Sequence, residues 1–170
     1  MGKPNIESAE VTTAELFTTY GAVLAELRAR GVVRTNNAPA GDYAEYLVAA
    51  GLGGTLVPPS VKSHDVRLPD GRLVQVKARV ISDPPVGGWR QLSAIRSWEF
   101  DWLVVVFLSN VDYHVVRAVK ISSAVAEAAA KWRAIDNANL LHATEDLLSL
   151  GIDVTEAVAA GAYKAIASGE

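Results

Sequence analysis

Apolar residues in the first third of the chain recur at helical spacing. The positions concerned are Leu16, Phe17, Tyr20, Val23, Leu24 and Leu27. Thr12 stands three residues before Glu15, which is the arrangement of a capping box, and Gly31 follows the last apolar position. This pattern predicts one helix behind a leader of residues 1–11. A second helix is expected over residues 42–50, before a group of glycines.

The middle of the chain changes to short runs that are typical of β-strands. Residues 64–68 and 73–81 are strand-like and flank Pro69-Asp70-Gly71, a sequence that favours a tight turn. Residues 102–108 are apolar throughout, as expected of a strand that is buried on both faces. A further strand is expected over residues 113–121.

The last third of the chain has the composition of helices. Residues 122–133 are rich in alanine, and Asp153 and Glu156 bracket the start of an apolar run that reaches Ser168. Acidic residues in a first turn suit the helix dipole. Helices before and after a block of strands predict an α/β or α+β fold with the sheet in the middle of the chain and extra C-terminal helices.

The expected hairpin brings polar side chains together. With a three-residue loop at Pro69–Gly71, Val66 lies opposite Val74 and Asp65 lies opposite Gln75. Since alternate residues and cross-strand partners share a face, one polar face is predicted to carry Asp65, Arg67, Gln75, Lys77 and Arg79. The opposite face, which is directed toward the core, carries Val66, Val74, Val76, Ala78 and Val80.

Two oxygen-bearing side chains on the polar face are suited to a hard divalent cation. Asp65 offers a carboxylate and Gln75 an amide oxygen, while the carbonyl of Val76 provides a third oxygen. Lys77 lies beside them and can orient or deprotonate a water molecule. His64 also lies here, but a lone histidine near a strand start is more often a packing residue than a ligand.

These residues resemble the signature of the PD-(D/E)xK nuclease superfamily, an Asp near one strand start and an acidic residue or Gln, then x-Lys, on the next strand. The chain has Asp65 and then Gln75-Val76-Lys77. Glu45 is similar to the glutamate that many members place on a preceding helix. Residues 30–121 also resemble an uncharacterised bacterial domain family assigned to this superfamily. The similar stretches are Arg34-Thr35-Asn36-Asn37-Ala38-Pro39, Gly41 to Glu45, Gln75 to Arg79, and Phe100-Asp101.

The resemblance implies a restriction-endonuclease-like α/β core over residues 1–121, with a central mixed sheet flanked by helices, and a C-terminal helical region over residues 122–170. It implies a DNA endonuclease that uses Mg²⁺ or Mn²⁺ and acts as a homodimer, because two DNA strands need two cuts. The implied metal ligands are Asp65, Gln75 and Glu45, with Lys77 as a further catalytic residue. The basic residues expected to contact DNA are Lys62, Arg79, Arg90 and Arg96.

Each of these residues also has a structural interpretation. Glu45 follows Asp42 by three positions and can complete a helix cap, and Asp65 can cap the end of a strand. Gln75 and Lys77 can form a solvated strand face. Because Gln75 replaces a carboxylate, a catalytically inactive module that binds DNA is one alternative function. A protein-interaction domain that uses the acidic C-terminal helices is another.

The net charge and the composition of the chain narrow the set of possible functions. The chain of 170 residues has a net charge of −3, which disfavours a protein that coats nucleic acid through bulk charge. The window from Lys62 to Arg96 has a net charge of +4, however, and it centres on the predicted site. The chain has no Cys, which excludes disulfides and thiolate chemistry. No apolar stretch approaches the ~18 residues of a membrane span, so a cytoplasmic protein without membrane partners is expected.

Overall fold

The computed structural model describes residues 12–35, 38–61 and 63–164. The chain divides into two units, Met1–Pro39 and Ala40–Glu170. The predicted leader, the pair Asn36-Asn37, Lys62 and the last residues of the predicted final helix lie outside the described residues.

The described part of the first unit contains one helix, α1 (Thr13–Ala29). The predicted capping box is confirmed, because the Thr12 hydroxyl accepts a hydrogen bond from the backbone N–H of Glu15 while the Glu15 carboxylate accepts one from the Thr12 N–H. The chain leaves the helix through Gly31, whose φ of 70° is a conformation that glycine adopts without strain.

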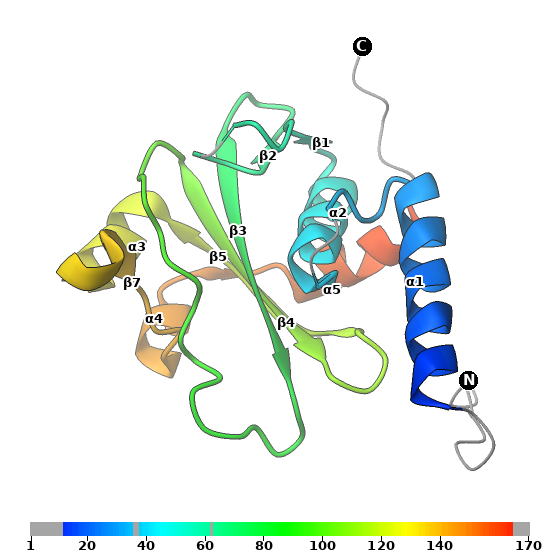
Figure 1. Ribbon diagram of the computed structural model, residues 1–170. Coiled ribbons are helices and arrows are strands. Elements are labelled where there is room, and N and C mark those ends of the chain that lie inside the picture. Colours follow the sequence, from blue (N-terminus) through cyan, green and yellow to red (C-terminus); the bar gives the residue numbers. More distant parts are fainter. Residues whose placement is uncertain (1–11, 36–37, 62, 165–170) are drawn as a thin grey trace. The chain divides into compact units, whose positions relative to one another are not determined.

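The second unit is built on a six-stranded sheet with the order β1-β2-β3-β4-β5-β8. Its strands are β1 (Thr55–Leu56), β2 (Val66–Arg67), β3 (Leu73–Ile81), β4 (Trp102–Ser109), β5 (Val115–Ser122) and β8 (Ile152–Asp153). Only β3 and β4 run parallel, and the other neighbours are antiparallel. The sheet is therefore mixed, with the apolar strand β4 near its centre (Figure 1).

One face of the sheet is covered by helices α2 (Ala40–Leu52) and α5 (Thr155–Ala160). Valines of β2, β3 and β4 pack there against Leu47 and Val48, which are both fully buried. The end of α2 also meets a short 3₁₀ turn, η2 (Gly161–Tyr163). Gly51 and Gly161 leave no room for a Cβ, because backbone atoms of the neighbouring element occupy that space. Glycine therefore sets how closely these segments approach each other.

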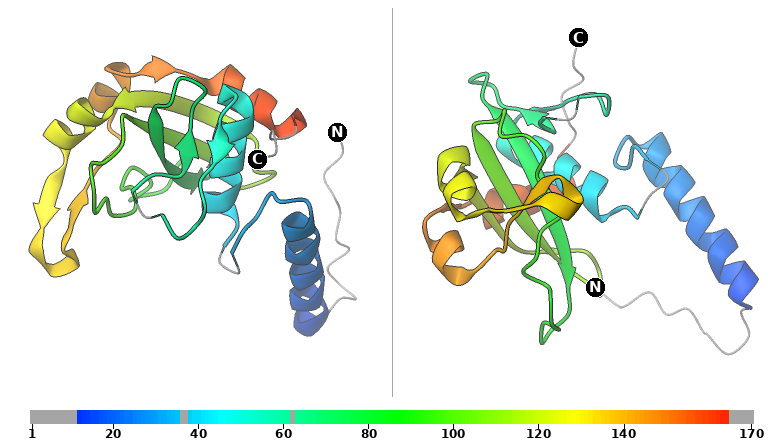
Figure 2. Two further views of the ribbon diagram at one scale, coloured as in Figure 1. Left: turned by 90° about the horizontal axis from the view of Figure 1, so that it is seen from above. Right: turned by 60° about the vertical axis from the view of Figure 1, so that its left-hand side comes forward.

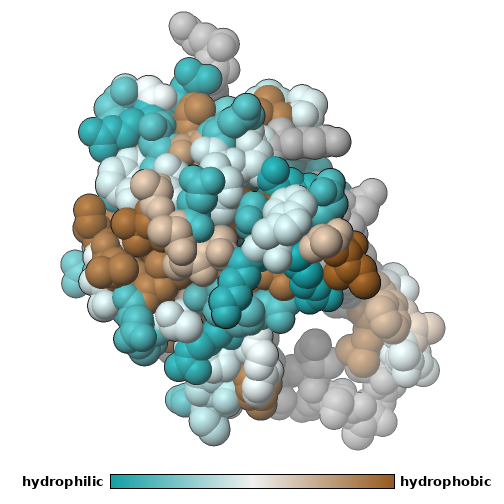
Figure 3. All heavy atoms as spheres, turned by 90° about the vertical axis from the view of Figure 1, so that its left-hand side faces the viewer, coloured by the Kyte–Doolittle hydropathy of each residue, from teal (hydrophilic) through white to brown (hydrophobic). Residues whose placement is uncertain are grey.

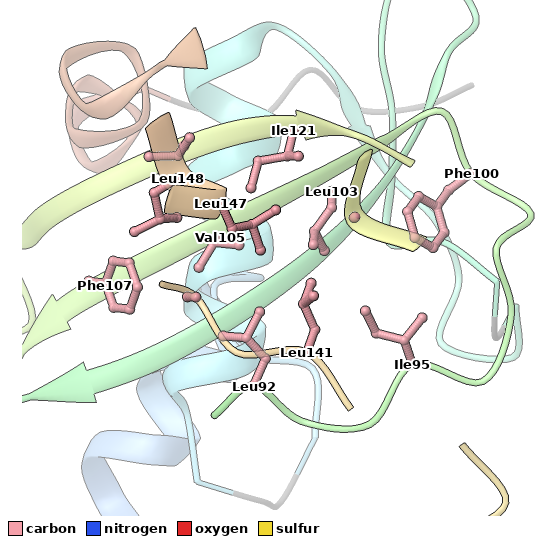
Figure 4. Close-up of a cluster of buried hydrophobic side chains, with 13 residues drawn as sticks. Leu92, Ile95, Phe100, Leu103, Val105, Phe107, Ile121, Leu141, Leu147 and Leu148 are labelled. Carbon is pink, nitrogen blue, oxygen red and sulfur yellow. The ribbon is translucent and has the colours of Figure 1, made fainter. Parts of the chain in front are cut away.

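The opposite face is covered mainly by chain without regular secondary structure. Residues 82–101 connect the parallel strands β3 and β4, and we call them the crossover segment. Such a connection is usually an α-helix, but here Leu92, Ile95 and Phe100 pack on the sheet without one. Helices α3 (Ser123–Ala129) and α4 (Glu145–Ser149) complete this layer, and Figure 4 shows the resulting apolar cluster.

The predicted α/β class, with a mixed central sheet flanked by helices, is confirmed. The predicted helix over residues 122–133 is only partly right, because α3 ends at Ala129 and β6 (Lys131–Arg133) follows. β6 pairs with β7 (Ala138–Leu140) through a 3₁₀ turn, η1 (Ala134–Asp136), and Asn137 at φ 46°. Asparagine tolerates this left-handed conformation, so the chain turns back instead of continuing as a helix.

The C-terminal region is part of the second unit's architecture. Strand β8 pairs with β5, and α5 packs on α2, so residues after 122 supply an edge strand and a core helix. The predicted helix over 153–168 is shorter in the described part, where α5 is followed by η2. Among the described residues, no helix is both long and apolar enough to cross a membrane.

Candidate functional site

The hairpin that carries the candidate site has the predicted register. Val66 pairs with Val74 and Arg67 with Leu73, while Gly71 closes the turn at φ 85°. The N–H of Asp65 donates to the carbonyl of Val74 at 2.8 Å, which extends the pairing to the residue before β2. The predicted division of faces holds for Val66, Val74 and Val76, which enter the core against α2, while Gln75 and Lys77 line the opposite side. The predicted core position of Val80 is wrong, because this residue is 36% exposed near the end of β3.

Asp65 is tied to β3 by its side chain. Its Oδ2 accepts a hydrogen bond of 2.7 Å from the N–H of Val76. Val76 lies on β3 two residues after Val74, the last residue of β3 that pairs with β2. The same oxygen accepts one from Nε2 of Gln75, and Nε2 also lies 3.5 Å from the carbonyl oxygen of Val76. Thus the carboxylate, the amide and one backbone carbonyl converge on one point at the edge of the hairpin. The hydrogen bond from Val76 also agrees with the structural interpretation of Asp65, in which this side chain caps the end of a strand.

Lys77 is held between the sheet and the crossover segment. Its Nζ donates to the carbonyl oxygen of Ala94 at 3.2 Å. Burial lowers the pKa of this ammonium group below its ordinary value, and the nearby charge of Arg96 lowers it further. Asp65 and Glu45 act in the opposite direction and raise the pKa, but burial dominates. The neutral amine is therefore a larger fraction of Lys77 near neutral pH than it is of an exposed lysine.

A cleft of about 470 Å³ opens over these residues. Asp65, Gln75 and Lys77 line one side of it, and the crossover segment lines the other side. The remaining lining residues are Pro59, Val61, Ser63, Ala94, Ile95, Arg96, Ser97 and Glu99. The structure thus brings together four of the predicted site residues, namely Asp65, Gln75, Lys77 and Arg96.

Glu99 is a residue of this cleft that the sequence did not indicate. Its carboxylate lies on the crossover segment, and its N–H donates to the hydroxyl of Ser97 at 3.1 Å. The segment has neither helical nor strand periodicity, so no pattern places Glu99 opposite Asp65. Its only signal was its position directly before the Phe100-Asp101 pair.

Glu45 and His64 lie beside this arrangement rather than among the lining residues. Glu45 is half-buried on α2 and is close enough for its charge to act on Lys77. His64 is 9% exposed, and its Nδ1 is within 3.0 Å of the hydroxyl of Ser63. Its Nε2 has no hydrogen-bond partner among the described residues, which fits a packing residue better than one oriented for catalysis.

Arg79 and Arg90 are two further basic residues that were predicted to contact DNA. Nε of Arg79 donates to the carbonyl oxygen of Gln91 and thereby holds the crossover segment. Arg90 stacks on Trp89 at 4.2 Å from the ring centroid and lines a different, smaller pocket. Lys62 lies outside the described residues. Trp89 and Trp98 contact Phe107 and Phe100, and both tryptophans pack against the apolar cluster on this face.

The donor set fits a hard divalent cation only in one orientation of Gln75. Here the amide directs its nitrogen at Asp65, and a half turn about its terminal bond directs the oxygen there instead. Asp65, Gln75 and the carbonyl of Val76 would then offer three oxygens, the ligand type that Mg²⁺ and Mn²⁺ prefer. Among the described residues, no group of three His, Asp or Glu side chains is placed to hold a metal.

Comparisons with protein-family models and with curated proteins found no match for this chain.

Proposed function

We propose that this chain is a metal-dependent nuclease that hydrolyses phosphodiester bonds in DNA. One observation carries the proposal. A lysine whose pKa is lowered by burial shares a cleft with an aspartate, an oxygen-bearing amide and an arginine. Phosphoryl transfer to water needs a place for a cation, a group that takes a proton and a positive charge for the phosphate.

Each residue of the cleft has a distinct task in this proposal. Asp65 and Gln75 would hold Mg²⁺ or Mn²⁺, which supplies Lewis-acid activation of the phosphate and of water. Lys77 accepts the proton of the attacking water through its neutral amine. Arg96, which is exposed at the rim, pairs with a phosphate oxygen. Glu45 acts through its charge on Lys77 and the cation.

The fold that we propose for this core is restriction-endonuclease-like. Helix α2 carries Glu45 and packs on the sheet whose strand β3 carries Gln75 and Lys77. Asp65 stands at the start of the strand that pairs with β3. This order, with a glutamate-bearing helix before an Asp and then Gln-x-Lys hairpin, supports the resemblance found in the sequence.

The test is cleavage of plasmid and branched DNA in the presence of Mg²⁺ or Mn²⁺. Replacing Lys77 by Met keeps the buried stem and removes the amine, so we expect roughly a 10²- to 10⁴-fold slower cleavage. The matched control is Lys120→Met, because Lys120 is also half-buried but packs on Trp102 against the other face of the sheet. Equal residual cleavage by the two variants would remove the role assigned to Lys77.

A second function is favoured by the orientation of Gln75. An amide nitrogen that donates to Asp65 occupies the place a cation would take, and it brings no negative charge to the site. The same fold can therefore serve as a DNA-binding module without catalysis. In that case the chain binds DNA but shows no heat of binding with Mg²⁺ or Mn²⁺ in calorimetry.

Gln75→Glu separates the two functions. The added carboxylate lies next to Asp65, so we expect the variant to bind Mg²⁺ or Mn²⁺ more tightly than the wild type. In a nuclease, cleavage by the wild type already depends on the metal. If the substitution creates metal binding and cleavage that the wild type lacks, the non-catalytic module is the correct function.

A further inference from the structure

A narrow β-hairpin projects from the second unit. Strands β6 and β7 pair through Lys131–Leu140, Trp132–Asn139 and Arg133–Ala138, and the tip is formed by η1 and Asn137. Figure 2 shows this hairpin extending away from the central sheet. Two large apolar side chains are exposed on it, Trp132 at 60% and Ile135 at 83%. We call the segment from Lys131 to Leu140 the projecting hairpin.

The projecting hairpin is fixed to the wall of the candidate cleft. Asn139 and Ile95 exchange two backbone hydrogen bonds of 2.8 and 2.9 Å, and the N–H of Leu92 donates to the carbonyl of Leu141 at 2.9 Å. Ile95 lines the cleft, and its neighbour Ala94 accepts the hydrogen bond of Lys77. A ligand that lies in the cleft and extends past the crossover segment therefore meets the hairpin at a defined position.

The side chains of β6 combine an aromatic surface with positive charge. Lys131 and Arg133 are both exposed and flank Trp132 along the strand. Because residues alternate between the faces of a strand, the indole points to one side and the two cations to the other. An aromatic ring and basic groups on the two sides of one narrow hairpin can bind a nucleic acid whose bases are accessible, by stacking on a base from one side and contacting the backbone from the other.

The size of the projecting hairpin disfavours a protein partner. A stable protein–protein interface buries about 800 Å² on each side around an apolar centre. The hairpin has strands of three residues each and only two large exposed apolar side chains. On the face of the unit that carries the hairpin, hydrophobic side chains form separate patches between hydrophilic ones (Figure 3). A nucleotide needs only one such side chain to stack on.

We propose that the projecting hairpin is a second nucleic-acid contact, in which Trp132 stacks on an unpaired base while Lys131 and Arg133 contact the phosphate backbone. It follows that the protein prefers DNA with unpaired bases, such as single strands or loops within a duplex, over continuous duplex. This inference rests on the proposed function, since it names the substrate class of the same site.

The test measures binding by fluorescence anisotropy with three labelled DNAs: a single strand, its continuous duplex, and a duplex with an internal unpaired loop. All proteins carry Lys77→Met, so that DNA is not cut during the titration, and Mg²⁺ is present. Trp132→Ala is expected to weaken binding to the single strand and the looped duplex roughly 5- to 150-fold, because this is the range found when a stacking residue is removed. The continuous duplex loses much less.

Two variants control for structure. Trp132→Phe keeps an aromatic face and is expected to retain most of the affinity, which a role in folding alone would not predict. Tyr163→Ala removes an aromatic residue that is even more exposed, 92% accessible on η2, and is expected to bind all three DNAs like the parent. Thermal unfolding of each variant shows that the fold is kept.

The outcomes separate this inference from the proposed function. If the wild type cuts DNA while Trp132→Ala binds all three DNAs like its parent, the hairpin contact is wrong and the nuclease stands. If Trp132→Ala converts a dimer to a monomer in sedimentation without altering DNA binding, the occupant is a second copy and the inference is overturned. If the parent binds none of the DNAs and the wild type cuts none, both proposals fail.

Discussion

The two faces of strand β3 are organised in different ways. The side toward α2 carries Val74 and Val76, which pack against helical residues that are almost completely excluded from water. The other side carries Gln75, Lys77 and Arg79, and of these Lys77 and Arg79 donate hydrogen bonds to backbone carbonyls of the crossover segment. We call the side of β3 that packs on α2 through apolar contacts the sealed face. The side that is joined to the crossover segment by hydrogen bonds is the bridged face.

The difference shows how one short strand can serve stability and chemistry together. Apolar packing is not directional and excludes water, so it stabilises the fold without leaving a cavity. The polar face keeps a cleft open, and it holds Lys77 in surroundings that lower its pKa. Substitutions on the two faces should consequently separate stability from activity.

The largest effect on stability is expected for Leu47→Ala on the sealed face. Leu47 is fully buried on α2, and truncating a buried leucine costs about 2–5 kcal/mol of unfolding free energy. Urea unfolding followed by circular dichroism measures this change. Lys77→Met, on the bridged face, should lose none of this stability. A loss below about 1 kcal/mol for Leu47→Ala would show that the two faces do not differ as described.

A smaller loss is expected for Asp65→Ala. This variant leaves the N–H of Val76 and the amide of Gln75 without their shared acceptor, at a cost of about 1–3 kcal/mol. Asp65→Asn keeps an acceptor oxygen and should lose less. The same urea titration compares both variants, and an Asp65→Ala protein as stable as the wild type would mean that the carboxylate does not secure the hairpin.

The bridged face should also give the stability a pH dependence. Because burial lowers the pKa of Lys77 in the folded state, the unfolded chain binds more protons between that lowered pKa and the ordinary 10.5. The unfolding free energy of the wild type relative to Lys77→Met should therefore rise with pH across this window. Cleavage should increase over the same pH range, as the neutral amine becomes populated. A difference that falls as pH rises would contradict the lowered pKa.

The smallest effect is expected for Lys120→Met, on the sealed side. Nζ of Lys120 lies 4.7 Å from the centroid of the Trp102 ring, and a cation–π contact of this kind contributes about 0.5–1 kcal/mol. The thermal midpoint should fall slightly while cleavage stays unchanged. Lys164→Met, at an exposed lysine after η2, provides the baseline for removing one positive charge.

The sequence predicted those parts of the structure that depend on local rules. The turn residues Pro69–Gly71 fixed the hairpin register, and that register placed Gln75 and Lys77 on one face. The capping box started α1, and the uninterrupted apolar run became β4 in the middle of the sheet. In each case neighbouring residues determine the outcome without help from distant ones.

The parts of the structure that the sequence did not predict depend on contacts between segments that lie far apart in the chain. The crossover segment has no helical or strand periodicity, because its apolar residues are placed by the sheet on which they pack. Its role as a wall of the cleft and the position of Glu99 could therefore not be predicted from the sequence. Alanine-rich composition favoured a helix over residues 122–133, but pairing with β7 converts Lys131–Arg133 into a strand. Local propensity is weak against such long-range pairing.

The contact of α2 with α5 and η2 has a consequence for synthesis of the chain. The hydroxyl of Tyr46 donates to the carbonyl of Lys164, 118 positions later, so the first helix of this unit is completed by the last turn among the described residues. At translation rates of about 5–20 residues per second, α2 waits roughly 6–24 seconds for that partner. During this time the side of α2 that packs on α5 has no native partner. A nascent chain that stalls before Thr155 would present this side of α2 to chaperones and proteases.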